Sequence, residues 1–198
     1  MAPVPIRIDQ SSNNPCETYK YGVDGNDILL DVSENWQSFS TENAGGEACF
    51  PKNIIGSSLW RHISEWETRE LYRTILERVR RDNRLASFPF RCDSPDKRRL
   101  LNLVVIPKEG NGINFESHVL RTELREPVAL LSGKVERSEE LLRVCSMCKK
   151  IAIANNEWVE VEIAVKQLGL FEKAVMPKFT HGVCQSCFDA VMATLDNR

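Results

Sequence analysis

Apolar residues alternate with polar ones in short segments that turn residues separate, which is the pattern of strands. Residues 24–27, Asp-Gly-Asn-Asp, divide the first two segments in the manner of a tight hairpin turn. Turn residues around Pro95 and Gly110 divide the last three. The predicted strands are residues 19–23, 28–32, 85–91, 100–106 and 113–120.

Between the first two strands and the last three, the apolar period changes to that of a helix. Leu71, Ile75 and Val79 recur every four residues within 67–82, and charged residues occupy most of the other positions. This segment is the strongest helix candidate. Shorter helices are expected near residues 33–39, 54–60, 136–143 and 159–171.

These elements predict an α+β protein in which a five-stranded antiparallel sheet has helices on one face and a small zinc-knuckle module with one helix follows. The first residues are rich in Pro, Ser and Asn and are expected to be a flexible arm. The expected divisions are an arm at 1–18, a sheet domain at 19–122, a connector at 123–143 and a cysteine module at 144–198.

The zinc prediction comes from two Cys-x-x-Cys units, Cys145 with Cys148 and Cys184 with Cys187, which are 35 residues apart. Each such turn places two sulfurs on one side of a tight loop. Two turns that face each other supply the tetrahedral set of four thiolates that Zn²⁺ accepts. Because four cysteines leave no position for water, the metal would be structural. Seven cysteines, arranged as two tight pairs and three single residues, do not resemble a disulfide framework.

Other interpretations of these cysteines remain open at the level of the sequence. Iron fits the same tetrahedral thiolate set. A dithiol redox pair, or four core cysteines without a ligand, would also produce the pattern. His181 lies three residues before Cys184, where it could replace one cysteine or donate a hydrogen bond to a thiolate. An ordinary packed or surface histidine is an equally good explanation of that residue.

The order of elements resembles a PAS domain over residues 19–122. Residues 31–36, Asp-Val-Ser-Glu-Asn-Trp, resemble the second strand and the start of the first helix of that family. Residues 54–60 resemble a later helix start. The resemblance implies a sensor or protein-interaction domain that can enclose a small ligand and can pair as a homodimer.

The C-terminal cysteines add a second resemblance. Residues 144–151, Trp158 and residues 180–187 resemble a cysteine-rich segment that follows PAS or receiver domains in bacterial signalling proteins. This implies a regulatory protein of two-component or related signalling, but it implies no activity. No kinase, cyclase or phosphodiesterase segment follows the PAS-like part, so we expect the protein to act by contact with a separate protein partner.

Aromatic residues are the candidates for lining a ligand pocket in the PAS-like part, although aromatic side chains are more often simply core. One histidine is a conceivable haem ligand, but no second haem feature accompanies it. The candidate pocket residues are Trp36, Phe39, Trp60, His62, Phe88 and Phe90.

Composition, charge and the absence of certain motifs argue against a nucleic-acid-binding protein, a membrane protein and an enzyme. Hydrophobic residues make up 42% and charged residues 27%, so the chain can bury a core, and the net charge of −2 does not favour nucleic acid. A zinc-finger regulator that uses the arginines between 78 and 84 is the alternative, and a thiol redox switch is another. No apolar run approaches the roughly 18–20 residues of a membrane span, and no signal peptide is evident, so we expect a cytoplasmic protein. With no phosphate-binding glycine loop or nucleophile elbow, we do not expect an enzyme.

Overall fold

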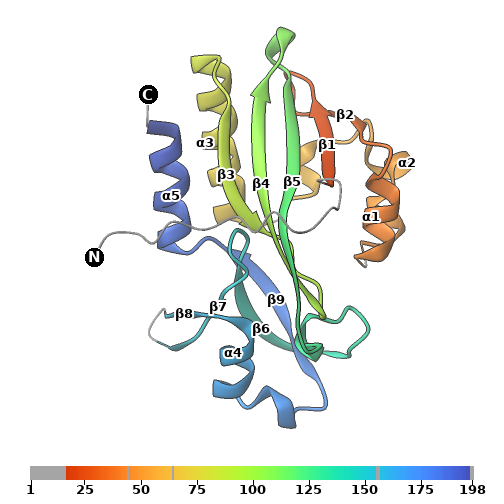
Figure 1. The fold of residues 1–198 in the computed structure, drawn as a ribbon, viewed down its shortest axis with the longest axis vertical. Coiled ribbons are helices and arrows are strands. Elements are labelled where there is room, and N and C mark those ends of the chain that lie inside the picture. The colour runs from red at the N-terminus through yellow and green to blue at the C-terminus, as the bar shows by residue number, and fades with distance from the viewer. Residues whose placement is uncertain (1–16, 44, 64, 155–156, 197–198) are drawn as a thin grey trace.

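The computed structural model describes residues 17–43, 45–63, 65–154 and 157–196 (Figure 1). The predicted flexible arm lies outside the described residues, except for Glu17 and Thr18. No helix of the described ranges is both long and apolar enough to cross a membrane.

Five antiparallel strands form the larger sheet, as the sequence predicted. Their order across the sheet is β2-β1-β5-β4-β3, so β1 lies between β5, the last strand of the meander, and the edge strand β2. The strands are β1 (Thr18–Val23), β2 (Leu29–Val32), β3 (Ala86–Arg91), β4 (Lys97–Pro107) and β5 (Ile113–Leu124).

Helices fill the sequence between β2 and β3. They are α1 (Trp36–Glu42), α2 (Pro51–Ile54) and α3 (Trp66–Asp82), with 3₁₀ turns at Glu47–Cys49 and Leu59–Arg61. The predicted long helix is confirmed as α3, and its apolar positions Leu71, Ile75 and Val79 are buried. They pack against inward-facing sheet residues such as Phe88 and Phe115, and together these side chains form the main core.

A second, four-stranded sheet has the order β8-β7-β6-β9 (Figure 1). Its strands are β6 (Arg137–Cys145), β7 (Ile151–Ala152), β8 (Trp158–Val159) and β9 (Met176–Gly182). β6 and β9 are parallel, and the other neighbours are antiparallel. Helix α4 (Val161–Gln167) and 3₁₀ turns at Ala129–Leu131 and Leu170–Glu172 accompany this sheet, and α4 confirms the helix predicted at 159–171.

The helix predicted at 136–143 is wrong, because this segment belongs to strand β6. Its Glu and Leu residues favour a helix locally. In the fold, however, Leu142 and Val144 point into a second core, and the backbone pairs with β9. Long-range pairing and burial outweigh the local preference here. The predicted boundary between residues 143 and 144 consequently falls inside β6, and the second core includes Leu130 from the predicted connector.

Helix α5 (Gln185–Asp196), which the sequence pattern did not predict, returns the chain to the first sheet. It lies beside β3 and α3 (Figure 1), and its Val191 is buried in the main core. A backbone hydrogen bond of 2.7 Å from Arg91 N to Met147 O also joins the two halves. The segment that carries the four cysteines is therefore packed against the larger sheet and its helix.

Candidate metal centre

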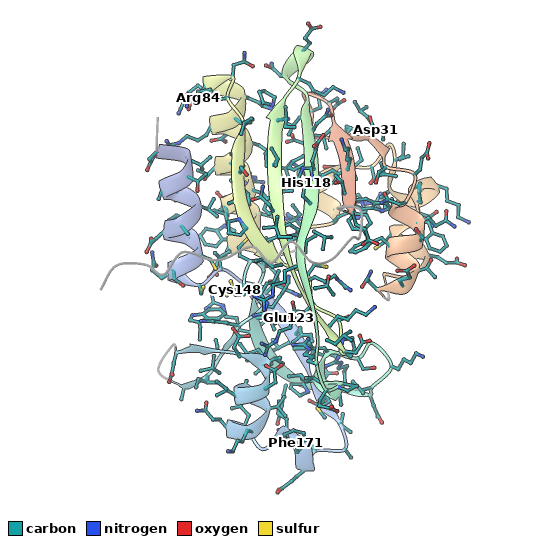
Figure 2. The ribbon with its side chains drawn as sticks, in the orientation of Figure 1. Asp31, Arg84, His118, Glu123, Cys148 and Phe171 are labelled. Atoms are coloured by element: carbon teal, nitrogen blue, oxygen red, sulfur yellow. The ribbon has the colours of Figure 1, made fainter. Side chains whose placement is uncertain are left out.

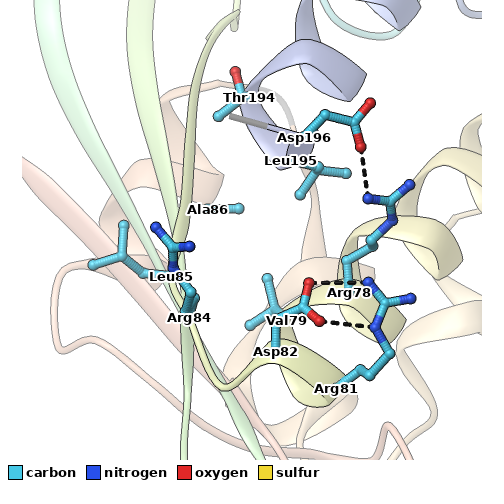
Figure 3. A pocket seen from close by; sticks show the side chains of 10 residues that line it. All are labelled: Arg78, Val79, Arg81, Asp82, Arg84, Leu85, Ala86, Thr194, Leu195 and Asp196. Carbon is cyan, nitrogen blue, oxygen red and sulfur yellow. Dashed lines mark hydrogen bonds and ion pairs between the residues drawn. The ribbon is translucent and has the colours of Figure 1, made fainter. Parts of the chain in front are cut away.

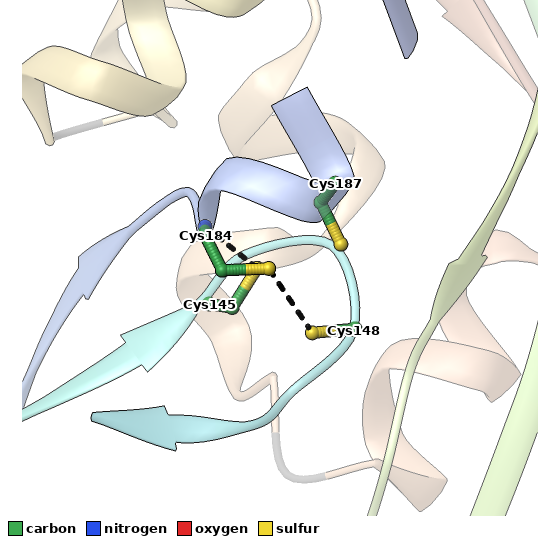
Figure 4. Close-up of side chains that lie close together, drawn as sticks. All are labelled: Cys145, Cys148, Cys184 and Cys187. Atoms are coloured by element: carbon green, nitrogen blue, oxygen red, sulfur yellow. Dashed lines mark hydrogen bonds between the residues drawn. The ribbon is translucent and has the colours of Figure 1, made fainter. Parts of the chain in front are cut away.

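The four cysteines of the two Cys-x-x-Cys units come together in space (Figure 4). Their Sγ atoms all lie within 4.8 Å of one another, and the Cys148 and Cys184 sulfurs are 3.8 Å apart. A tetrahedron of thiolates at the zinc–sulfur bond length of about 2.3 Å has edges of about 3.8 Å. The sulfur atoms are therefore at separations that suit a single metal ion, and this set of cysteines could hold one.

Parallel pairing of β6 with β9 brings the two turns to the same end of the second sheet. β6 ends at Cys145 and β9 ends at Gly182, and these two residues are partners in the register. Ser146 N donates to Gly182 O at 2.8 Å, directly between the two turns. Because parallel neighbours run in the same direction, the segments that follow them start side by side, although 35 residues separate them in sequence.

The first turn is a tight reversal between β6 and β7. Lys149 N donates to Cys145 O at 3.0 Å, and Cys145 N donates to Lys150 O at 2.8 Å. Lys149 adopts a φ of 62°, the left-handed conformation that closes the turn. This geometry places the Cys145 and Cys148 side chains on one side of the loop.

The second turn is the start of helix α5. The backbone amides of Cys187 and Phe188 both donate to Cys184 O at 3.0 Å, and these bonds set the first helical turn. Cys184 N donates to the Cys145 sulfur at 3.4 Å, and the Ser186 hydroxyl lies 3.3 Å from the Cys184 sulfur. The backbone thus directs a polar N–H group at one of the four sulfurs, as is favourable for a thiolate.

The electrostatics of the cluster favour a cation. Hydrogen bonds from the Cys148 and Cys187 thiols hold the pKa of Cys145 far below its usual range. The same bonds raise the pKa of Cys148 to about 12 and also raise the pKa of Cys187. With no cation, the cluster thus favours ionisation of Cys145 and disfavours ionisation of Cys148 and Cys187, because negative charges so close together repel one another. A divalent metal removes this repulsion and allows all four thiols to ionise.

Hydrogen bonds and an ion pair connect the cysteine turns to helix α3. The Glu67 carboxylate accepts a 3.0 Å hydrogen bond from Val183 N and also pairs with Arg143 of β6. Thr68 and Ser146 share a hydroxyl–hydroxyl hydrogen bond of 2.7 Å. A Cβ at Gly182 would lie only 2.5 Å from Arg143 Nε and 2.8 Å from Glu67 Oε2, so a larger residue at this position would displace the ion pair between these two side chains. Cys148 accordingly lies where the two parts of the chain meet (Figure 2).

Sequence reasoning identified the four cysteines but not the side chains that fasten them. Glu67 and Thr68 are 76 or more residues away from their partners Arg143 and Ser146. Glu67 looked like one solvated charge among many on a helix, so nothing in its local pattern indicated this role. The His-Gly pair before Cys184 did indicate a close contact, because Gly182 is the residue that packs against the side chains of Glu67 and Arg143.

His181 is not among the grouped sulfur ligands. It precedes Gly182 on β9 with an exposed side chain, and the metal-ligating group found among the described residues contains only the four cysteines. Alternation along the strand explains this, because His181 and Gly182 face opposite sides of β9. The suggestion that His181 replaces a cysteine as ligand therefore receives no support from its position.

The candidate pocket aromatics lie in different surroundings. Trp36 donates from Nε1 to Cys49 O at 3.0 Å and stands edge-on to Tyr21. Phe39 contacts Tyr19 with ring centroids 4.0 Å apart. Trp60 donates from Nε1 to Asp27 Oδ2 at 2.9 Å. These contacts account for the three rings without a ligand.

The other candidates lie nearer to the cysteines. Phe88 is buried in the main core, and Phe90 is half-buried. Both line a crevice of about 220 Å³ between β3 and α5, which Cys148 and Cys187 also line. His62 is exposed, and its Nε2 lies 2.8 Å from the Ser57 hydroxyl. The sequence offered no indication that Phe88 and Phe90 would adjoin the cysteine cluster.

We expect Trp60→Ala to destabilise the protein by about 3 kcal/mol, at the lower end of the range for truncated core aromatics, because Trp60 is half-buried. Trp60→Phe keeps most of the packing and loses only the bond to Asp27, so its cost should be about 1 kcal/mol. Urea unfolding of both variants measures this. A cost below about 1 kcal/mol for Trp60→Ala would contradict a packing role and favour a ligand-binding one.

A larger hollow, of about 550 Å³, lies between the ends of α3 and α5 (Figure 3). Two of the arginines that line it have acidic partners: Arg78 contacts Asp196 at 2.6 Å, and Arg81 contacts its neighbour Asp82 at 2.8 Å. These are exposed ion pairs of the kind found on ordinary surfaces.

Comparisons with known proteins supply no family. No protein-family model and no curated protein matches this sequence. Among solved structures, a domain of an HTR-like protein from Haloarcula marismortui ATCC 43049 is similar, with 11% sequence identity and a TM-score of 0.38. The similarity covers 52% of this chain and 98% of that domain. At this level it carries no inference about function, and the chemistry of the four cysteines remains the informative feature.

Proposed function

We propose that this chain is a cytoplasmic signalling or regulatory protein of the bacterial two-component type, in which a structural zinc centre joins a PAS-like unit to a C-terminal unit. The observation that carries the proposal is the convergence of four Sγ atoms within 4.8 Å. Two turns far apart in sequence supply them, and hydrogen bonds to α3 fix both turns against the larger sheet. A metal at this point stabilises the arrangement of the two units.

The four cysteines suit a structural zinc ion better than a catalytic metal ion. Four cysteines close the coordination shell, and a closed shell leaves no position for water or substrate. Cys145 and Cys184 are buried with the apolar side chains of the main core, which excludes solvent from one side. Iron in the same four-thiolate set is the alternative metal, and its thiolate charge-transfer colour distinguishes it from colourless zinc.

The PAS-like assignment of residues 19–122 draws support from the sheet. Two strands, a helical segment and a three-stranded meander form one antiparallel sheet in the order β2-β1-β5-β4-β3. A sensor or protein-interaction role follows from the resemblance, as does pairing into a homodimer. In this proposal the protein is not an enzyme and passes its signal to a separate protein partner.

Charge pairing favours a protein partner over nucleic acid. The arginines of α3, which made a basic face conceivable, have acidic partners: Arg78 pairs with Asp196 and Arg80 pairs with Asp27, both at 2.6 Å. Arg99 is buried and donates to Cys92 O. Arginines that are already paired contribute little to the release of counterions that drives binding to polyanions.

Metal analysis of protein purified without added metal tests the proposal. We expect one zinc ion per chain by elemental analysis, and a native mass that exceeds the sequence mass by one zinc. Stoichiometric iron would replace the metal assignment, and metal-free folded protein would remove the basis of the proposal. The same native spectrum reports whether two chains associate.

A further inference from the structure

The four cysteines differ in their access to solvent. Cys145 and Cys184 are 0% and 2% exposed, whereas Cys148 and Cys187 are half-buried. The accessible pair contains one residue from each turn. Oxidation of thiolates follows exposure, so these two sulfurs are the first that a reagent from solvent can reach.

A crevice leads to this accessible pair. It has a volume of about 220 Å³, it lies between β3 and the N-terminal half of α5, and Cys148 and Cys187 line it. Its other walls are largely apolar, with Phe88, Phe90, Leu100 and Val191 among them. Figure 4 shows Cys187 on the first turn of α5 and Cys148 at the end of the opposite loop.

We propose that this crevice is a thiol-modification site at which small organic hydroperoxides convert Cys148 and Cys187 into a disulfide and displace the metal. The inference rests on the proposed zinc centre and assigns a reaction to two of its ligands. The largely apolar wall suits the alkyl or aryl group of such a peroxide, while a charged oxidant loses hydration against the apolar side chains.

The reaction balances in two steps. One of the two thiolates attacks the terminal oxygen of R–O–O–H, so that the O–O bond breaks, a sulfenic acid forms and the alkoxide takes a proton from water to become R–OH. The second thiolate then attacks the sulfenic sulfur, the S–S bond forms and hydroxide leaves. The two sulfurs together lose two electrons, and the hydroperoxide gains them.

Disulfide formation removes half of the ligand set. The two sulfurs start within 4.8 Å of each other, so a short movement joins them. Cys145 and Cys184 then remain as the only two thiolates of the cluster, and two ligands bind zinc far more weakly than four. The accessible pair also spans both turns, so oxidation links the loop after β6 covalently to α5 while the metal leaves.

The experiment follows zinc release from the zinc-loaded full chain, with cumene hydroperoxide as the probe and peptide mapping of the first disulfide. We expect a Cys148–Cys187 disulfide that forms in step with zinc release, and recovery of the metal after reductant and zinc are added. A first disulfide within either Cys-x-x-Cys turn, or between Cys145 and Cys184, would overturn the proposal.

Two alanines of α5 supply matched variants. Ala190 lines the crevice, whereas Ala193 is exposed on the same helix outside it. Ala190→Phe should fill the crevice and slow zinc release by cumene hydroperoxide several-fold, and Ala193→Phe should not. Equal rates in both variants would overturn the role of the crevice. Hydrogen peroxide, which has no organic group, should discriminate less between them.

The half-buried Cys92 lies outside the sulfur group and serves as an internal standard. If Cys92 is oxidised before any zinc is released, the peroxide does not react preferentially with Cys148 and Cys187, and the inference fails. This failure differs from failure of the zinc centre, because in that case the purified chain would contain no zinc before any peroxide is added.

Discussion

Cys148→Ser is expected to abolish stoichiometric zinc binding and to lower the stability of the main core as well as that of the C-terminal segment. Zinc binding contributes an apparent free energy of about 10–16 kcal/mol in small zinc peptides at neutral pH. A domain has a total stability of only about 5–15 kcal/mol. The loss of one of four ligands should therefore lower the free energy of unfolding by several kcal/mol.

The location of the effect follows from the packing. Cys145, Met147 and Cys184 share a buried cluster with α3 and with Phe88 of β3. When the metal is lost, the cysteine turns no longer hold their places against that cluster. Hydrogen exchange should consequently rise in α3 and β3, and not only near the C-terminus.

Thermal unfolding, zinc content and hydrogen exchange of the variant measure these expectations, with Cys92→Ser as the matched control. Cys92 is also half-buried but lies outside the sulfur group, so its replacement should leave the zinc content unchanged. Full zinc occupancy and an unchanged melting curve in Cys148→Ser would contradict the metal centre. Altered exchange confined to the last helix would contradict the coupling to the main core.

Local sequence pattern predicted the elements whose own residues determine them. The four-residue period of Leu71, Ile75 and Val79 predicted α3, and turn residues predicted the five strands of the larger sheet. The two Cys-x-x-Cys units predicted a cluster of four sulfurs because each unit constrains its own pair. In each case, neighbouring residues alone supply the signal.

Elements that depend on distant partners could not be predicted in this way. The residues of β6 favour a helix, and only the pairing with β9 and the second core make them a strand. Glu67 became part of the cysteine site through contacts with Arg143 and with the backbone of Val183. The register and docking that create these contacts are properties of the whole fold.

Arg91→Met is expected to destabilise the protein by about 3–5 kcal/mol, because it breaks a buried ion network between the two halves of the chain. Arg91, at the end of β3, pairs with Asp93 and contacts Glu160 beside α4 at 2.7 Å. The Asp93 side chain is only 3% exposed. The other basic neighbour of Asp93 is Arg125, which lies 3.5 Å from the Asp93 carboxylate and also forms an ion pair with Glu162. Removal of Arg91 therefore leaves a buried carboxylate without its nearest counterion.

Lys178→Met is the matched control, because it removes a similar contact at the surface. Lys178 pairs with Glu139 at 2.6 Å, but the Glu139 side chain is 92% exposed, so the cost should stay within about 1 kcal/mol. Urea unfolding measures both variants together with the double variant Arg91→Met, Asp93→Asn. The double variant should be more stable than Arg91→Met alone, because Asp93→Asn removes the buried negative charge that has lost its counterion. Equal costs for Arg91→Met and Lys178→Met would mean that water reaches the network and that the two halves are joined chiefly by the cysteine cluster and the packing of α5.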